Sequence, residues 1–320
     1  MGTKLSDEEQ CRLAAGLAAV CRSADLDPAG AELVRYTMNA VYRLPAAGVV
    51  VRMRSGPNAA AQVARVAQVA VALAKLDLPV VRLAPDVPQP IHADGWSATV
   101  WILLEQPPAH RFSPADLAGP LRRLHSLTGA PTSLPRWDVL GTVRCRLAET
   151  STKSGAELAF LQCWATQAVG TPLAAILDRL GDRCDQLAID LTTVEWTLPE
   201  AVIHGDAHAA NLLRAPSGEV IMGDLDTTAL GPPEWDLTPA AHGAVRFGDD
   251  PRTYAAFAEA YGLDVTARPA WQVLSSIREL QLLTSVIANL PGRPEVAEQL
   301  AHRLRTSLAG DHSTRWQRYR

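Results

Sequence analysis

The stretch from residue 202 to residue 226 alternates polar side chains with short apolar runs. Its polar groups follow a fixed order, with Asp206 first, Asn211 next, and Asp224 and Asp226 after a turn. A hairpin brings its two ends together, so Asn211 before the turn and Asp224 after it could offer oxygen ligands to one Mg²⁺ ion. Asp206 then stands where a carboxylate could accept the proton of a hydroxyl being phosphorylated. The spacing therefore predicts phosphoryl transfer.

The same stretch contains a catalytic-loop pattern. His204, Asp206 and Asn211 have the H-x-D-x₄-N spacing of kinase catalytic loops, with Gly205 in the place of the arginine. The loop also resembles the signature of the aminoglycoside phosphotransferase family, a His-Gly-Asp-x-His-x-x-Asn sequence that His208 completes. Further segments that look like this family are residues 39–44, 124–125, 234–237 and 278–280. The resemblance covers roughly residues 33 to 308.

The resemblance implies an α+β, two-lobed, protein-kinase-like fold. A small β-rich N-terminal lobe would take residues 1–104, and a larger, mainly helical C-terminal lobe would take residues 105–320. By position, Asp206 would be the catalytic base. The metal ligands for Mg²⁺ on the phosphates of ATP or GTP would be Asn211, Asp224 and, as a further contact, Asp226. The acceptor would be a hydroxyl of a small molecule such as an antibiotic, in a resistance or self-protection role.

The N-terminal lobe contains the expected nucleotide site and its main departure from the kinase pattern. The residues expected to bind the nucleotide are Asn39, Arg52, Trp101 and Leu103. Arg52 occupies the position of the usual phosphate-binding lysine, and arginine can also bridge phosphates. The helix glutamate that normally pairs with this lysine would fall near Val66, yet no acidic residue lies between Gly56 and Lys75. Gln62, Gln68 or an acid from elsewhere would then have to orient Arg52.

Other polar residues are expected to support the loop or to contact the acceptor. His204 is expected to pack beneath the loop, Asp236 to accept hydrogen bonds from its backbone, and His208 either to stabilise it or to contact substrate. The candidates for contact with a cationic acceptor are Asp249, Asp250 and Glu279. Solvated surface acids are the alternative reading of these three. A neutral or nucleoside-like hydroxyl acceptor therefore stays open.

The elements that must position these residues follow from local patterns. Ser6 and Glu9 have capping-box spacing at the start of a helix, and Pro45 separates two β-type runs, 33–44 and 48–54, that fit an antiparallel hairpin. Further strands are expected at 80–83 and 97–104, with a Pro-rich loop at 85–90 between them. The other expected helices are 59–78, 116–127, 157–168, 172–191, 252–261, 269–290 and 294–308. Strands first and helices later indicate α+β lobes.

Composition excludes several classes of protein. The 320 residues are 48% hydrophobic and 20% charged, as in globular proteins, and the net charge of −4 argues against a dedicated nucleic-acid binder. Five scattered cysteines indicate neither a disulfide framework nor a zinc site. Acidic residues precede the apolar run 13–21, and polar residues interrupt 59–78, so we expect a cytoplasmic protein without a membrane anchor.

Two alternatives come from other functional classes. The missing lysine and glutamate pair allows a non-catalytic, kinase-like binding protein. A metal-dependent hydrolase could instead use His204, Asp206, His208 and Asp224 as ligands. The acceptor, the choice between ATP and GTP, and the oligomeric state do not follow from the sequence.

Overall fold

The computed structural model describes residues 5–36, 39–107, 111–127 and 134–319. Contacts between Cα atoms divide the chain into two compact units. The first unit comprises residues 1–112, 131–134 and 209–228, and the second comprises residues 113–130, 135–208 and 229–320. The lobe boundary expected after residue 104 stays a prediction. The division by contacts differs from it mainly by assigning residues 209–228 to the first unit.

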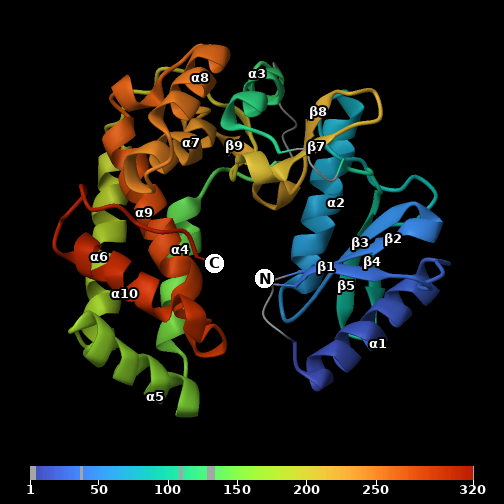
Figure 1. The fold of residues 1–320 in the computed structure, drawn as a ribbon, viewed down its shortest axis with the longest axis horizontal. Helices are drawn as coiled ribbons and strands as arrows, with labels where there is room; N and C mark the ends of the chain where they lie inside the picture. Colours follow the sequence, from blue (N-terminus) through green and yellow to red (C-terminus); the bar gives the residue numbers. More distant parts are fainter. Residues whose placement is uncertain (1–4, 37–38, 108–110, 128–133, 320) are drawn as a thin grey trace. The chain divides into compact units, whose positions relative to one another are not determined.

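The first unit is built on a five-stranded sheet with the strand order β1-β2-β3-β5-β4 (Figure 1). Its strands are β1 (Glu32–Tyr36), β2 (Ala40–Leu44), β3 (Val49–Ser55), β4 (Ile91–Ala93) and β5 (Trp96–Ile102). All neighbouring strands are antiparallel, and β2 and β3 form the hairpin expected around Pro45. Residues 37–38 of the predicted run 33–44 lie outside the described residues.

Two helices pack against this sheet. Helix α1 (Asp7–Ser23) begins with the expected capping box of Ser6 and Glu9. Its Leu13 and Leu17 share a buried core with Val51 of β3 and Val100 of β5. Helix α2 (Ala59–Lys75) also packs against β5, all but the last residue of which is buried. Because side chains alternate along a strand, the residues directly before and after Val51 in β3 point to the opposite face of the sheet.

The first unit also contains a hairpin of β7 (Leu212–Arg214) and β8 (Val220–Met222), which confirms the turn expected between them. The strand predicted at 80–83 is wrong. Val81 N donates to Met222 O of the hairpin, whereas Ala84 N donates to Val100 O of the sheet. The segment thus links the hairpin to the sheet through isolated bridges, because its backbone hydrogen bonds are divided between two partners.

The second unit is mostly helical. Its helices are α3 (Ala118–His125), α4 (Val139–Ser151), α5 (Gly155–Trp164), α6 (Leu173–Leu191), α7 (Glu234–Arg246), α8 (Pro251–Tyr261), α9 (Trp271–Ile287) and α10 (Ala297–Leu308). A two-stranded sheet joins β6 (Ala201–Ile203) to β9 (Ala229–Gly231). The six helices expected in this region are confirmed to within a few residues. Helices α4 and α7 were not expected, because Gly141 interrupts the first pattern and Pro239 the second.

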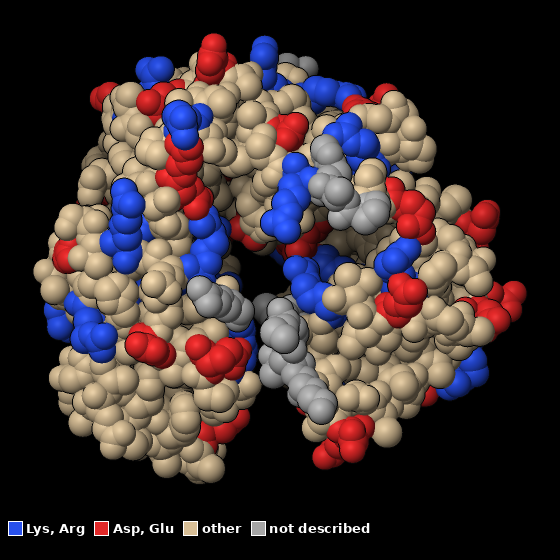
Figure 2. All heavy atoms as spheres, viewed as in Figure 1, with Lys and Arg blue, Asp and Glu red and all other residues tan. Residues whose placement is uncertain are grey.

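Lys and Arg side chains are interspersed with Asp and Glu over the face drawn in Figure 2. Among the described residues, no helix has the length and apolar character needed to cross a membrane.

His242 lies in the core of the second unit, on α7. It is 1% exposed and contacts the rings of Phe247 and Trp316. Burial and, to a smaller extent, the positive charges of Arg278 and Arg246 together lower the pKa of its imidazole to about 3. The imidazole is therefore neutral in the folded protein at pH values where it would be protonated in the unfolded chain.

Acidification from pH 7 to pH 5 should consequently destabilise the fold through His242. Below its ordinary pKa of 6.5 the imidazole binds a proton only in the unfolded state, so the free energy of unfolding falls as the pH falls. The expected loss is about 2 kcal/mol at pH 5. Urea denaturation of wild type and His242→Phe at both pH values measures it. The variant should lose this part of the pH dependence, and an unchanged dependence would refute the assignment.

Candidate active site

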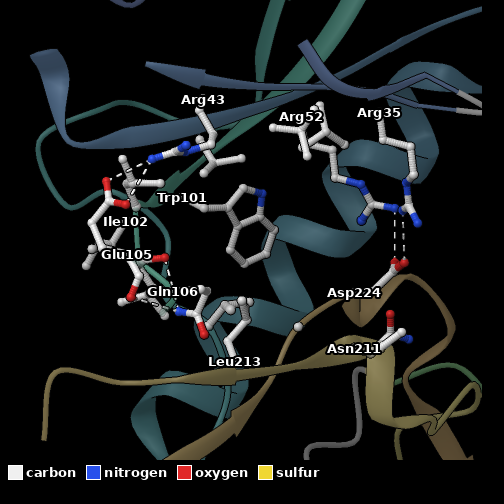
Figure 3. Close-up of a pocket in the computed structure, with 18 residues that line it drawn as sticks. Arg35, Arg43, Arg52, Trp101, Ile102, Glu105, Gln106, Asn211, Leu213 and Asp224 are labelled. Atoms are coloured by element: carbon white, nitrogen blue, oxygen red, sulfur yellow. Dashed lines mark hydrogen bonds and ion pairs between the residues drawn. The ribbon is translucent and has the colours of Figure 1, made fainter. Parts of the chain in front are cut away.

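The register of the first sheet gathers a row of side chains on one face. Val41 pairs with Arg52, and Val50 pairs with Trp101 across β3 and β5. These positions alternate with the buried Val51, so they lie on the face opposite α1. They line a cavity of about 570 Å³ within the first unit (Figure 3). Strand register therefore explains why an arginine and an indole meet in one cavity.

One end of this cavity is formed by the connector that follows β5. Leu103 lines the cavity there, and the guanidinium of Arg43 pairs with the carboxylate of Glu105 at 2.9 Å. Gln106 ties the connector to the hairpin: its Nε2 donates to the carbonyl of Arg214 at 3.1 Å, and its Oε1 accepts from Arg214 N at 2.9 Å. Trp101 points into the space between these groups and the hairpin (Figure 3).

The other end of the cavity contains candidate metal ligands. Asn211 and Asp224 both line it, and Gly223 N donates to Asn211 O at 2.7 Å, which holds the two ends of the hairpin together. Asp224 adopts a left-handed backbone with φ of 57°, a strained conformation that often marks functional positions. An amide oxygen beside a carboxylate suits Mg²⁺, which usually takes few protein ligands and shares the rest with phosphates and water.

Arg52 finds its acidic partners in the turn that follows β8. Its Nη2 donates to Asp224 Oδ1 at 3.0 Å, and its Nη1 and Nη2 donate to the two carboxylate oxygens of Asp226 at 2.5 and 2.7 Å. Arg35 of β1 adds an ion pair with Asp224 at 3.6 Å. The sequence left open whether Gln62, Gln68 or an acid from elsewhere orients Arg52. In the structure, the partners of Arg52 are acids from outside helix α2. Asn39 precedes β2 and is not among the described residues that line the cavity.

Asp206 lies in the loop after β6, in the second unit. Arg278 of α9 donates to its Oδ1 at 3.1 Å, and His208 Nε2 lies 3.6 Å from its Oδ2. Burial raises the pKa of this carboxyl, but the hydrogen bond from His208 and the charge of Arg278 lower it more, so the net pKa is well below its ordinary value. The side chain is 36% exposed. Asp206 is thus an ionised and accessible carboxylate at neutral pH.

A buried carboxylate holds the loop from beneath. Asp236 of α7 accepts hydrogen bonds from His204 N at 2.6 Å and Gly205 N at 2.7 Å. His125 Nε2 lies 3.1 Å from the same carboxylate. Gly205 has a φ of 83°, which favours glycine, and its carbonyl accepts from the indole of Trp235 at 2.8 Å. The loop backbone is therefore fixed on both sides of Gly205.

The three candidate acids for substrate contact all have basic partners. Asp249 pairs with Arg318 at 2.5 Å, and Asp250 caps α8 and pairs with Arg252 at 2.7 Å. Glu279 is 2% exposed. Its carboxylate pairs with Arg246 at 3.0 Å and with Arg183 at 3.6 Å. The structure places Glu279 in the interior.

Two basic residues of the site were not predicted. Arg35 could have been suspected from its place on a strand beside the cavity-facing row, since it pairs in register with Val41. Arg278 belongs to a segment that resembled the family, but the sequence alone does not say that its guanidinium reaches Asp206. Among the residues that the structure describes, no group of three or more His, Cys, Asp or Glu is placed to hold a metal ion.

Comparison with known proteins decides the family. The sequence profile of the phosphotransferase enzyme family matches residues 30–276. The chain belongs to this family. A search of curated proteins finds no match. The expected family resemblance is therefore confirmed. The matched range contains the loop with Asp206 and the hairpin segment with Asn211 and Asp224.

Solved structures show the fold. Aminoglycoside phosphotransferase APH(3'')-Id from Streptomyces rimosus is 22% identical with a TM-score of 0.56, over 84% of this chain and 98% of that one. Choline kinase LicA from Streptococcus pneumoniae is 13% identical with a TM-score of 0.56, over 95% and 100%. Amicoumacin kinase hAmiN, solved with AMP-PNP, Ca²⁺ and Ami, is 11% identical with a TM-score of 0.61, over 98% and 96%. The predicted α+β, protein-kinase-like fold is confirmed.

Proposed function

We propose that this chain is a Mg²⁺-dependent kinase that transfers the γ-phosphoryl group of ATP or GTP to a hydroxyl of a small molecule. One observation supports it above the others: Arg52, Trp101, Asn211 and Asp224 all line one cavity of about 570 Å³. The cavity offers a cation for phosphates, an apolar slot for a base and oxygen ligands for a metal. Membership of the phosphotransferase family is the supporting context.

The residues of the first unit would bind the nucleotide in one orientation. The nucleobase would occupy the apolar part of the cavity, beside Trp101, Val50 and Leu213. The phosphates would lie toward Arg52, whose guanidinium can bridge two of them. Asn211 and Asp224 would hold Mg²⁺, which when bound neutralises charge on the phosphate oxygens. Asn39, which lies before β2, would act from outside the described lining.

Asp206 of the second unit would act on the acceptor. Its lowered pKa makes it a weak base but a permanent hydrogen-bond acceptor, so it would orient the acceptor hydroxyl and take its proton late in the transfer. Positioning of this kind suffices because phosphoryl transfer needs little covalent chemistry from the protein. His204 and Asp236 would support the loop, and His208 would help to keep the carboxylate ionised.

The charges around Asp206 favour an acceptor that is neutral or modestly charged. Arg278 contacts the carboxylate directly, and the proposed acceptor-binding acids Asp249, Asp250 and Glu279 are already paired with arginines. A polycationic acceptor would need free acidic groups. We therefore propose a hydroxylated antibiotic of low positive charge as the acceptor, with a resistance or self-protection role in the cytoplasm.

Acceptor-dependent release of ADP or GDP tests this function. The purified protein would be incubated with Mg²⁺, with ATP or GTP, and with a panel that runs from neutral nucleoside-like compounds to polycationic aminocyclitols. We expect release to exceed background hydrolysis with a hydroxylated acceptor of low charge, and the product to gain one phosphoryl group by mass spectrometry. Nucleotide binding without transfer to any acceptor would favour the non-catalytic alternative.

A further inference from the structure

Arg52 stands in the position of the kinase lysine, but its usual partner is missing. Helix α2, which would supply the partner glutamate, has the sequence AAAQVARVAQVAVALAK and contains no acidic residue. A phosphate-binding cation without a fixed partner would lose side-chain entropy when it binds phosphate. Something else must therefore hold Arg52 in position.

Asp226 meets the geometric requirement for this partner. Both of its carboxylate oxygens accept from the Arg52 guanidinium, at 2.5 and 2.7 Å, in the two-point geometry that orients arginine best. Arg52 is only 13% exposed and the Asp226 side chain 28%, so solvent screens the pair weakly. Asp224 makes a single contact with Arg52, at 3.0 Å.

The position of Asp226 separates it from the candidate metal ligands. Asn211 and Asp224 line the cavity, whereas Asp226 is not among the described residues that do. Both oxygens of the Asp226 carboxylate accept hydrogen bonds from the Arg52 guanidinium. Asp224, with one oxygen on Arg52 and the other 3.6 Å from Arg35, is held more loosely.

Helix α2 still helps to position Arg52, because it contacts the backbone of Asp226. Arg65 of α2 donates from its guanidinium to the carbonyl oxygen of Asp226. The turn of residues Leu225–Thr227 packs against the same helix. Helix α2 thus holds the turn that contains Asp226, and Asp226 holds the guanidinium of Arg52. In the usual arrangement the helix would supply the acid directly.

We infer that Asp226 is the positioning residue of Arg52, in place of a helix glutamate, and that it is not a metal ligand. The inference rests on the proposed nucleotide site. It assigns the metal to Asn211 and Asp224, and not to Asp226. Asp226 would hold Arg52 in position whether or not Asp224 binds the metal. Loss of the Asp226 charge should therefore weaken phosphate binding without changing its dependence on Mg²⁺.

Calorimetric titration of ATP with Mg²⁺ and with EDTA separates the two roles. Wild type, Asp226→Asn and Asp224→Asn would be compared with Asp86→Asn, a matched control at an exposed position of the first unit. We expect Asp226→Asn to weaken ATP binding about tenfold under both conditions, so that the ratio of the two Kd values stays that of wild type. In Asp224→Asn the ratio should fall to near one. Asp226→Glu, which keeps the carboxylate, should recover part of the affinity and serves if Asp226→Asn does not fold.

Two results would overturn the inference. In the first, Asp226→Asn loses Mg²⁺ dependence as Asp224→Asn does, which would make Asp226 a metal ligand. In the second, Asp226→Asn binds ATP as wild type does, which would remove any positioning role. A wild-type protein that binds neither ATP nor GTP would instead overturn the proposed function itself, so the two failures are distinguishable.

Discussion

Replacement of Asp206 by asparagine is expected to slow phosphoryl transfer about 10²–10⁴-fold while leaving nucleotide affinity unchanged. The amide cannot accept the hydroxyl proton, and it no longer presents a negative charge to the acceptor. The nucleotide residues belong to the other compact unit, so their contacts with one another do not include Asp206. Steady-state rates with the acceptor found by screening, together with calorimetric Kd values for ATP, measure both effects.

The control for this prediction is Asp182→Asn, the same chemical change at an exposed position of α6. It should keep the wild-type rate. An Asp206→Asn variant that transfers phosphate at the wild-type rate would remove the carboxylate from the mechanism. A variant that loses ATP binding as well would show that Asp206 serves the nucleotide site instead.

Replacement of Asp236 by alanine is expected to lower the free energy of unfolding by about 3 kcal/mol. It leaves the backbone N–H groups of His204 and Gly205 without their acceptor inside the protein, and it removes one of the two partners of the His125 ring. The catalytic loop should lose its position as well, so that kcat falls even under conditions where the variant is folded. Urea denaturation and kcat at low temperature measure the two effects.

Asp249→Ala offers the comparison, because it removes an acid whose ion pair with Arg318 is exposed. Surface ion pairs contribute little, so this variant should lose less than about 1 kcal/mol. Equal losses in the two variants would contradict the role given to Asp236 beneath the loop.

The chemistry of the loop could be predicted from sequence because it is local. Asp206 and Asn211 lie on one short loop, and the turn chemistry of residues 216–218 predicts the hairpin that brings Asp224 back beside Asn211. The β-type runs on either side of Pro45 likewise predict the hairpin on which Arg52 lies. In each case the residues that matter are close in sequence, so spacing carries the information.

Long-range partners could not be predicted in this way. The pair of Arg52 and Asp226 joins positions 174 residues apart, and only the folded sheet and hairpin bring them together. The burial of Glu279 could not be predicted either. An acidic residue on a helix is usually exposed, but Glu279 lies in the interior and pairs with Arg246. Helix α7 was missed because Pro239 is a helix breaker by propensity, which tertiary packing overrides here.

Titration of ATP and GTP, each with Mg²⁺, into wild type and Asp224→Ala tests the central claim most directly, because it needs no knowledge of the acceptor. Wild type should bind at least one of the two nucleotides, and the variant should bind it more weakly, at the affinity of wild type without Mg²⁺, since Asp224 lines the cavity as a candidate metal ligand. Equal binding by both proteins, or binding of neither nucleotide by wild type, would contradict a metal and nucleotide site in this cavity.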